Sequence, residues 1–304
     1  MTNTPDNIYV DALIIGRGPA GIQAALYIAR SGLSLAVAGY DAGSLALAES
    51  IENYYGLPEP VTGAALQQTG EKQAKALGAA LYDCQVVGFG YDDSGDYIAM
   101  ASGAVFHAKT ILIATGAKRV KVPVKGIDAY EGKGVSYCAV CDGFLYRGKK
   151  AGVLGHGEYA FSEAGELAAI NGNVAIFTNG ERPDFGAGAD KADPAVYEIV
   201  QAKIKSLEGG ERLSGVRFED GSYRDLDGLF IAYGTAGGSD LARKLGVVID
   251  AKGNITADAD QATNVPGVYA AGDCTGVFRQ IAVAAGQGAI AARSMISYVR
   301  NLKK

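Results

Sequence analysis

Apolar runs of strand length alternate with helically spaced apolar residues at the start of the chain. Residues 8–15 alternate between apolar and polar positions and then run continuously apolar, as a buried parallel strand does. In residues 22–30 the apolar side chains recur at helical spacing, with Ile22 and Leu26 on one face. Residues 33–38 form a second apolar run. The pattern predicts a strand–helix–strand unit of the kind that builds parallel sheets.

A glycine-rich turn joins the predicted strand to the helix. Residues 16–21 read G-R-G-P-A-G and match the G-x-G-x-x-G motif. Between a strand and a helix this motif typically binds the pyrophosphate of a dinucleotide, because the glycines let the backbone approach and the helix N-terminus is positive. At the end of the second strand only Asp41 is available as a ribose-binding carboxylate. We therefore predict a dinucleotide site here, and a glycine turn without a ligand is the less favoured alternative.

The same pattern occurs again in the middle of the chain. Residues 151–154 predict a strand, residues 155–160 read G-H-G-E-Y-A, and residues 161–170 have helical spacing before a further strand at residues 173–178. Two such units in a chain of 304 residues predict an α/β protein with two dinucleotide-type domains, since a domain averages about 150 residues.

Composition and charge exclude several classes of protein. Hydrophobic residues make up 48% of the chain and charged residues 20%, which is typical of a globular protein. The 43 glycines are about twice the usual share of roughly 7%, as expected where backbone approaches a ligand. A net charge of −5 without a long basic run argues against an extended nucleic-acid surface. No stretch reaches the ~18 uninterrupted apolar residues of a membrane span, and residues 1–7 do not resemble a signal peptide, so we expect a cytoplasmic protein without membrane partners.

Two cysteines are spaced for redox chemistry. Cys138 and Cys141 form C-A-V-C, and such a pair either closes a small disulfide ring or binds a metal. A zinc site needs about four ligands. The other cysteines and histidines occur singly, at Cys84, His107, His156 and Cys274. We therefore favour a redox disulfide and expect no metal.

Asp142 directly follows the second cysteine. As a neutral carboxyl in a dry pocket it could exchange the proton that each thiol–disulfide step requires. Because Gly143 comes next, it could equally be a solvated turn residue. From these residues alone both interpretations stay open.

The motifs of this chain, taken in order, resemble those of low-molecular-weight flavin thioredoxin reductases. The shared motifs are G-x-G-x-x-G at 16–21, I-E-N-Y-Y-G at 51–56, A-T-G at 114–116, C-A-V-C-D at 138–142, A-A-G-D at 270–273 and R-Q at 279–280. The likeness covers essentially the whole chain. It implies two Rossmann-like, three-layer domains, the second inserted into the first. The FAD-binding domain would comprise residues 1–117 and 246–304, and the central domain, which carries the cysteines, residues 118–245.

The same resemblance implies the cofactor, the partners and the roles of the residues. FAD would be bound by Gly16, Gly18, Pro19, Ala20, Gly21, Asn53, Thr115, Gly116, Gly272, Asp273, Arg279 and Gln280. Cys141 would face the flavin, Cys138 would attack the disulfide of thioredoxin, and Asp142 would relay a proton. The family also implies a homodimer, in line with the frequency of two-fold symmetry among soluble oligomers.

The match fails where NADPH should bind. Family members that use NADPH resemble G-G-G-[DN]-[ST]-A at the second turn and H-R-R-x-x-x-R at the end of the next strand. Here His156 and Tyr159 add bulk to the turn, and residues 177–183 replace the arginine pair. A 2′-phosphate is best held by guanidinium groups, and this segment offers only Arg182 beside the repulsive Glu181. We predict that NADPH is not the donor. NADH stays compatible, because Glu181 follows the turn near the ~20-residue spacing of a ribose carboxylate.

The degraded turn leaves the electron donor to be inferred. Thioredoxin reductases that lack the NADPH motif resemble this chain there and in the A-G-D-C-T-G segment at 271–276. Some take electrons from reduced ferredoxin, others take hydride from a deazaflavin, and a further relative holds a second FAD. We predict ferredoxin, with Lys118, Arg119 and Lys121 available to an acidic partner unless they form a solvated linker. The alternatives are deazaflavin or NAD(P)H as donor, a diflavin reductase, a simple flavin dehydrogenase, and a non-catalytic redox sensor.

Overall fold

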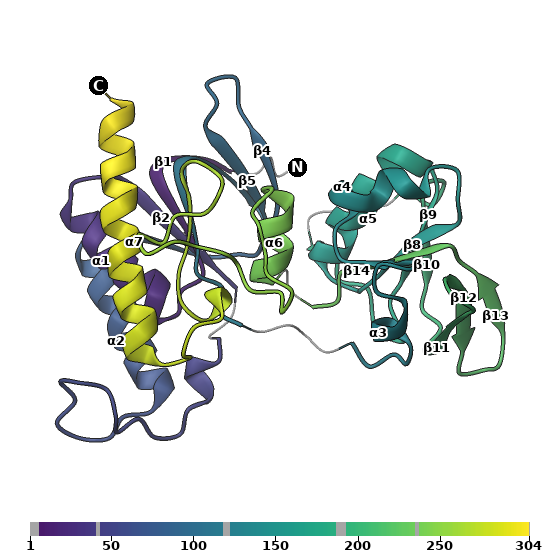
Figure 1. Ribbon diagram of the computed structural model, residues 1–304, viewed down its shortest axis with the longest axis horizontal. Helices are drawn as coiled ribbons and strands as arrows, with labels where there is room; N and C mark the ends of the chain where they lie inside the picture. Colours follow the sequence, from purple (N-terminus) through teal and green to yellow (C-terminus); the bar gives the residue numbers. More distant parts are fainter. Residues whose placement is uncertain (1–5, 41–42, 118–121, 187–192, 235–236, 304) are drawn as a thin grey trace. The chain divides into compact units, whose positions relative to one another are not determined.

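The chain forms two compact units in the computed structural model (Figure 1), which describes residues 6–40, 43–117, 122–186, 193–234 and 237–303. The first unit combines Met1–Lys118 with Gly237–Lys304, and the second is Arg119–Ala236. The second unit is therefore inserted into the first along the chain. Each unit is described below by itself.

A seven-stranded mixed sheet forms the centre of the first unit. Its strands are β1 (Asp6–Ile15), β2 (Leu35–Gly39), β3 (Ala80–Asp83), β4 (Val86–Tyr91), β5 (Tyr97–Ala101), β6 (Ala104–Ile113) and β15 (Val268–Ala270). The order β3-β2-β1-β6 is parallel, and β15 adds in parallel to the C-terminal end of β6. The N-terminal part of β6 instead pairs antiparallel with β5, and β5 with β4. Because the parallel strands share one direction, the turns that follow β1 and β6 meet at one edge of the sheet.

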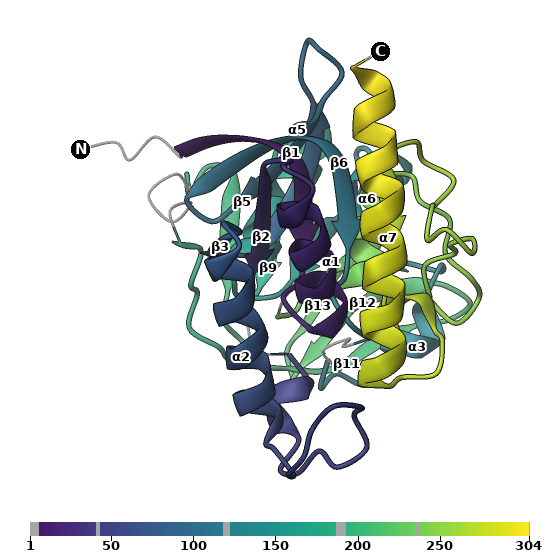
Figure 2. The same cartoon turned by 90° about the vertical axis from the view of Figure 1, so that its left-hand side faces the viewer.

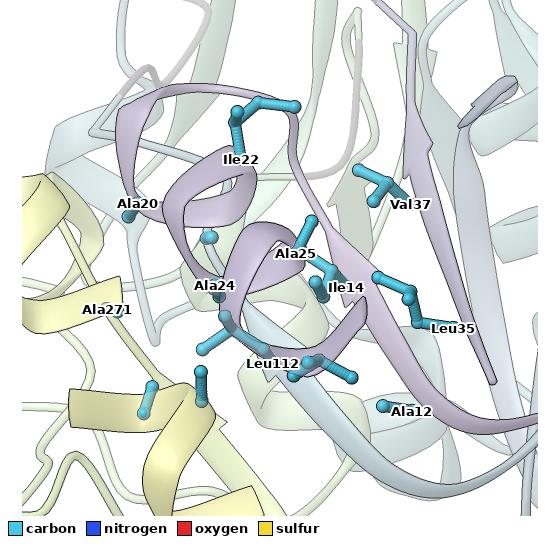
Figure 3. Close-up of a cluster of buried hydrophobic side chains, with 14 of the residues drawn as sticks. Ala12, Ile14, Ala20, Ile22, Ala24, Ala25, Leu35, Val37, Leu112 and Ala271 are labelled. Atoms are coloured by element: carbon cyan, nitrogen blue, oxygen red, sulfur yellow. The ribbon is translucent and has the colours of Figure 1, made fainter. Parts of the chain in front are cut away.

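Two helices of this unit pack side by side and cover one face of the sheet (Figure 2). Helix α1 (Pro19–Arg30) begins at a proline, which suits the first helical position. Helix α7 (Ile281–Leu302) crosses it so closely that a Cβ on Gly288 would lie 2.1 Å from the Ala20 carbonyl oxygen. The core between α1 and the sheet is built from small and branched side chains (Figure 3), including Ala20, Ala24 and Ile14.

Two further helices complete the first unit. Helix α2 (Gly63–Ala76) is capped by Thr62, whose Oγ1 accepts the amide of Ala65 at 3.2 Å. Helix α6 (Gly238–Lys244) packs on β4 and β6, and its side chains Leu241 and Ala242 are buried there. The boundary expected at residue 246 is therefore wrong. The chain returns to the first unit at Gly237, because the apolar side of α6 belongs to that unit's core.

The second unit has a five-stranded parallel sheet and a small antiparallel sheet. The parallel strands are, in spatial order, β10 (Tyr197–Val200), β9 (Val174–Phe177), β8 (Ala151–Leu154), β14 (Gly228–Ile231) and β7 (Val135–Ser136). The antiparallel strands are β11 (Ile204–Gly209), β12 (Leu213–Phe218) and β13 (Tyr223–Asp225). Helix α5 (Glu158–Asn171) packs on β8 and β9, and apolar side chains such as Leu154, Phe177 and Val216 fill the core shared by the two sheets.

Short helices connect these elements. They are α3 (Ile127–Tyr130), α4 (Ala139–Asp142) and 3₁₀ turns at Leu45–Leu47, Gly143–Tyr146 and Asp273–Thr275. The predicted strand–helix–strand units correspond to β1-α1-β2 and β8-α5-β9, so the α/β fold with two Rossmann-like units is confirmed. Among the described residues no helix is long and apolar enough to cross a membrane.

Two glycines of α7 provide a matched test of the α1–α7 contact. Gly288→Ala should lower the free energy of unfolding by about 1–3 kcal/mol, because its Cβ would overlap the Ala20 carbonyl. Gly286→Ala meets nothing within 4 Å and should raise stability by up to about 1 kcal/mol through helix propensity. Urea unfolding of both variants measures the difference. Equal stabilisation by the two substitutions would contradict the close approach of the helices.

Candidate active site

The first glycine turn leaves one position open to a ligand. Gly16 has φ +110°, and a Cβ there would lie 2.2 Å from the Ala114 carbonyl oxygen at the end of β6. A Cβ on Gly21 would lie 1.9 Å from the Gly16 carbonyl oxygen. By contrast, a Cβ on Gly18 would meet no protein atom within 4 Å. Gly16 and Gly21 thus serve the packing of the turn, and Gly18 faces open space where a phosphate can approach the backbone.

The N-terminus of α1 suits an anion. Its N-cap residue, Gly18, makes no side-chain hydrogen bond, and the first turn holds no acidic residue. The amides of Ala20 and Gly21 therefore meet no competing negative charge from the helix itself. A helix end of this kind binds phosphate through its free amides and its dipole. The turn fits the pyrophosphate of FAD.

Packing around this turn collects the other predicted FAD residues. A Cβ on Gly272, which has φ +83°, would lie 3.0 Å from Ala20 Cβ. Asn53 Nδ2 donates to Gln280 Oε1 at 3.3 Å, which joins two segments far apart in the sequence. The structure thus places these residues close together, although the FAD contacts themselves remain predictions.

Asp273 and Arg279 also interact. Burial raises the pKa of Asp273 above its ordinary value, and the positive charge of Arg279 acts in the opposite direction. Thr115 lies near this segment, since a Cβ on Gly238 would meet Thr115 Oγ1 at 2.6 Å and Cys274 Cβ at 3.1 Å. Burial raises the pKa of the Cys274 thiol to about 12, so Cys274 is a packing residue rather than a nucleophile.

Sequence reasoning missed Gln287. Its Oε1 accepts the amide of Gly272 at 2.8 Å and lies 3.4 Å from the hydroxyl of Thr275. The side chain therefore holds the A-G-D turn from the buried side of α7. A signal was present, because Gln287 is the polar interruption of an otherwise apolar run at residues 281–292.

The end of β2, where a ribose carboxylate was expected, is held by a different pair. Arg17 packs its side chain against Gly39, whose Cβ would lie 2.9 Å from Arg17 Cγ, and forms an ion pair with Asp83 at the end of β3. Asp41 lies outside the described residues, as do Lys118, Arg119 and Lys121. No group of three or more His, Cys, Asp or Glu residues in the described part of the chain is arranged to bind a metal.

In the second unit the two cysteines form a disulfide across the first turn of α4. Cys138 is the N-cap residue and is joined to Cys141. Its Sγ accepts the amide of Cys141 at 3.2 Å. Cys138 is completely buried, whereas Cys141 is partly exposed. The helix start therefore provides an N–H donor aimed at the sulfur of Cys138, the position that stabilises a thiolate after reduction.

Ser136 connects the disulfide to the predicted proton relay. Its hydroxyl donates to Asp142 Oδ2 at 2.7 Å, and the same oxygen accepts the amide of Cys138 at 3.2 Å. Asp142 is partly buried and hydrogen-bonded rather than a fully solvated turn residue. Sequence reasoning missed Ser136, although its place two residues before the cysteine was a usable signal.

Glu163 is the second residue that sequence reasoning missed here. Its Oε2 accepts the amide of Ala139, between the two cysteines, at 2.7 Å. Glu163 is completely buried. It lies on the apolar side of α5 with Ala160, Ala164 and Leu167, and a charged residue among such positions is the sequence signal for it.

Three large apolar side chains beside the disulfide face solvent. Val140 stands between the cysteines and is 51% exposed. Phe144 and Leu145 follow Asp142 and are 61% and 53% exposed. We call Val140, Phe144 and Leu145 the apolar rim of the disulfide.

The second glycine turn repeats the framework of the first. A Cβ on Gly155 would lie 2.1 Å from the Ala232 carbonyl oxygen, as Gly16 does against Ala114. The His156 ring meets the Tyr233 ring edge-on at 5.3 Å between centroids. Tyr159 is 1% exposed and belongs to the core rather than to the turn surface.

The segment after β9 folds back onto this second turn. The amide of Asp184 donates to the His156 carbonyl oxygen at 2.7 Å, and Asp184 bridges to Gly157. Phe185 is buried and stacks on Phe161 of α5 at 5.2 Å. The chain itself thus occupies backbone positions at the nucleotide turn.

The end of β9 is likewise used for internal structure. Asn179 has φ +55°, and its Oδ1 accepts the amide of Ile204 in β11 at 2.7 Å. Thr178 Oγ1 donates to the Glu181 carbonyl oxygen at 2.7 Å. Where an NADPH enzyme of the family would place arginines, this chain forms a turn closed by its own polar groups.

Comparison with known proteins agrees with this geometry. A family model described as pyridine nucleotide-disulphide oxidoreductase matches residues 10–288. Thioredoxin reductase from Aquifex aeolicus is 32% identical and is covered over 97% of its length by all of this chain. An alkyl hydroperoxide reductase flavoprotein relative from Xanthomonas campestris is also 32% identical over 95% of the chain, but the chain spans only 57% of the length of that protein.

Solved structures show the same relationship. The atypical thioredoxin reductase TRi from Desulfovibrio vulgaris Hildenborough has a TM-score of 0.89 and 44% identity, covering 96% of this chain and 98% of that one. A ferredoxin-flavin thioredoxin reductase from Clostridium acetobutylicum has a TM-score of 0.68 and 29% identity, covering 98% and 100%.

These relatives support thioredoxin-disulfide reductase activity with FAD as the cofactor, and the resemblance to flavin thioredoxin reductases is confirmed at this level. The chain belongs to the pyridine nucleotide-disulphide oxidoreductase family, as a thioredoxin reductase-like flavin disulfide oxidoreductase.

Proposed function

We propose that the protein reduces thioredoxin through Cys138 and Cys141, with electrons that reach its FAD from reduced ferredoxin rather than from NADPH. The observation that carries the choice of donor is the closure of the second nucleotide turn by the chain's own residues, Asp184 and Phe185. Thioredoxin, ferredoxin and a homodimeric state all belong to this proposal.

The energetic argument against NADPH follows from the contacts at the second turn. The segment 177–183 offers one guanidinium, Arg182, next to Glu181, in place of an arginine pair. Losing two charge-assisted contacts at roughly 1.5–3 kcal/mol each weakens binding by about 10²–10⁴-fold. Opening the Asp184–His156 bond and moving the buried Phe185 would cost more. Binding of NADPH at useful concentrations is therefore unfavourable.

A ferredoxin donor is supported by two comparisons. The solved ferredoxin-flavin thioredoxin reductase covers this chain almost completely at 29% identity, and the Desulfovibrio protein at 44% identity is described as atypical. When bound, the flavin would supply the chemistry that links one-electron donors to a two-electron acceptor. The residues that would hold it are the turn at 16–21, Asn53, Thr115, Gly116 and the segment 272–280.

The cysteines carry out a two-step exchange. After reduction, the Cys138 thiolate attacks the substrate disulfide, forms a mixed disulfide and releases one substrate thiolate. The Cys141 thiolate then attacks Cys138 Sγ, which restores the internal disulfide and releases the second thiolate. Two electrons pass from the cysteine pair to thioredoxin, and the released thiolates take up two protons. Asp142, held by Ser136 beside Cys138, is placed to exchange one of these protons.

The apolar rim favours a protein substrate over a small disulfide. Val140, Phe144 and Leu145 are exposed around the redox pair, and clustered exposed apolar side chains are typical of protein contact sites. Because Cys138 is buried in the oxidised state, its sulfur must become accessible once the disulfide opens. We propose that thioredoxin docks on this rim at that stage.

The donor can be tested by steady-state thioredoxin reduction under anaerobic conditions. NADPH, NADH, reduced ferredoxin and reduced deazaflavin are supplied in turn. We expect turnover with ferredoxin, and kcat/KM with NADPH about 10²–10⁴-fold below that of an NADPH-using relative measured alongside. Rapid turnover at micromolar NADPH would restore the ordinary NADPH enzyme. Turnover with NADH or deazaflavin alone would replace ferredoxin by that donor.

The disulfide relay can be tested with single cysteine variants. Cys138→Ser should leave FAD bound and reducible but abolish thioredoxin reduction, because the attacking thiolate is lost. Cys141→Ser should also abolish it, since no thiol remains to release the mixed disulfide. Cys84→Ala, at a buried position outside the redox pair, is the control and should retain activity. Activity of Cys138→Ser would show that the relay is misassigned.

Flavin content and electron capacity separate the remaining alternatives. We expect one FAD per chain, because only the first turn is open, and uptake of four electrons per chain, two by the flavin and two by the disulfide. Anaerobic reductive titration with absorbance detection measures both. Two flavins per chain would indicate a diflavin reductase, and a capacity of two electrons a simple flavin dehydrogenase. Four electrons without any disulfide turnover would indicate a redox sensor.

A further inference from the structure

Glu163 reaches into the redox pair from the helix that follows the second glycine turn. Its carboxylate accepts the amide of Ala139 at 2.7 Å, and both residues are completely buried. A buried carboxylate is costly and is rarely kept unless its hydrogen bonds or its charge are used. The amide it binds belongs to one of the two residues between the cysteines.

This contact divides the amides at the start of α4 between two acceptors. The amide of Cys141 donates to Cys138 Sγ at 3.2 Å, and that of Ala139 donates to Glu163. The amide of Cys138 itself donates to Ser136. The N-terminus of a helix normally favours thiolate formation at its cap. Here a carboxylate takes one of the amides and adds a negative charge next to the thiolate position.

We propose that Glu163 is a positioning residue of the redox pair: it holds the C-A-V-C turn through Ala139, and its negative charge keeps the reduced pair strongly reducing. The inference rests on the proposed disulfide exchange. A strongly reducing pair suits a protein that must pass electrons on to thioredoxin.

The surrounding charges do not offset this effect. Helix α5 and the 3₁₀ turn Gly143–Tyr146 pack on α4, and neither they nor α4 carry a lysine or arginine. The other ionisable side chains of these elements are Asp142, Tyr146, Glu158, Tyr159 and Glu166. Those that carry charge at neutral pH are all acidic.

The sign of the effect gives it a characteristic pH dependence. A nearby negative charge disfavours the thiolate and so raises the thiol pKa, and removing it should lower that pKa by about 1 pH unit. Reduction of the disulfide takes up two electrons and two protons when both thiols are protonated. At a pH below the thiol pKa of both proteins, Glu163→Gln should therefore match the wild type. Above both pKa values, the variant's reduced pair is stabilised up to about tenfold, or about 30 mV.

The experiment uses the FAD-loaded protein reduced with dithiothreitol. The pH profile of alkylation of the Cys138–Cys141 segment, followed by mass spectrometry, gives the thiol pKa without any donor or thioredoxin. Equilibration with a reference dithiol at pH 6 and pH 9 gives the redox shift. Glu166→Gln, one turn further along α5 and partly exposed, is the matched control and should behave as the wild type.

Glu163→Gln keeps the size and a hydrogen-bond acceptor while removing the charge, and we expect a lower alkylation midpoint and a redox shift present at pH 9 but absent at pH 6. Glu163→Asp keeps the charge and should stay closer to the wild type. An unchanged midpoint in Glu163→Gln, a shift that is equal at both pH values, or an Asp variant shifted as far as the Gln variant would overturn the role of the charge. These readouts do not require thioredoxin reductase activity, so they fail independently of the proposed function.

Discussion

Both units depend on one backbone contact, in which the first glycine of a turn lies against the carbonyl group at the end of a neighbouring strand. Gly16 meets Ala114 in the first unit, and Gly155 meets Ala232 in the second. A side chain at either glycine would push the turn away from the sheet. The contact brings the N-terminus of α1 or α5 to the strand ends, which is where parallel α/β sheets bind ligands.

The two turns share this framework but are used differently. In the first, Gly18 faces open space and the helix start carries no acidic residue, so an anionic cofactor can approach. In the second, Asp184 and Phe185 lie on the turn, and Asn179 and Thr178 close the strand end. The second turn has the packing role of its glycines while its binding surface is covered. This contrast is the physical basis for separating the FAD site from the choice of donor.

The redox pair is held from three directions by short-range contacts. Ser136 comes from β7, Glu163 from α5, and the helix start itself supplies the amide of Cys141. Such contacts set the position and the charge environment of Cys138, on which thiol reactivity depends. The same helix, α5, begins at the second glycine turn. A helix that follows a nucleotide-type turn therefore shapes the disulfide chemistry of this protein.

Local patterns were sufficient to predict the two β-α-β units, the first glycine turn and the cysteine pair, because periodicity and motif spacing are properties of neighbouring residues. They were insufficient wherever a residue acts on a distant segment. The seven residues of α6 gave too short a pattern to show that Leu241 packs on the first sheet, so the boundary was misplaced. Gln287 and Glu163 looked like interruptions of apolar helix faces, and only the folded chain shows the amides of Gly272 and Ala139 that they bind. Asp184 and Phe185 carried no motif, and only tertiary structure brings them onto the second turn, since the hydrogen bond and ring stacking there join segments that the sequence leaves well apart.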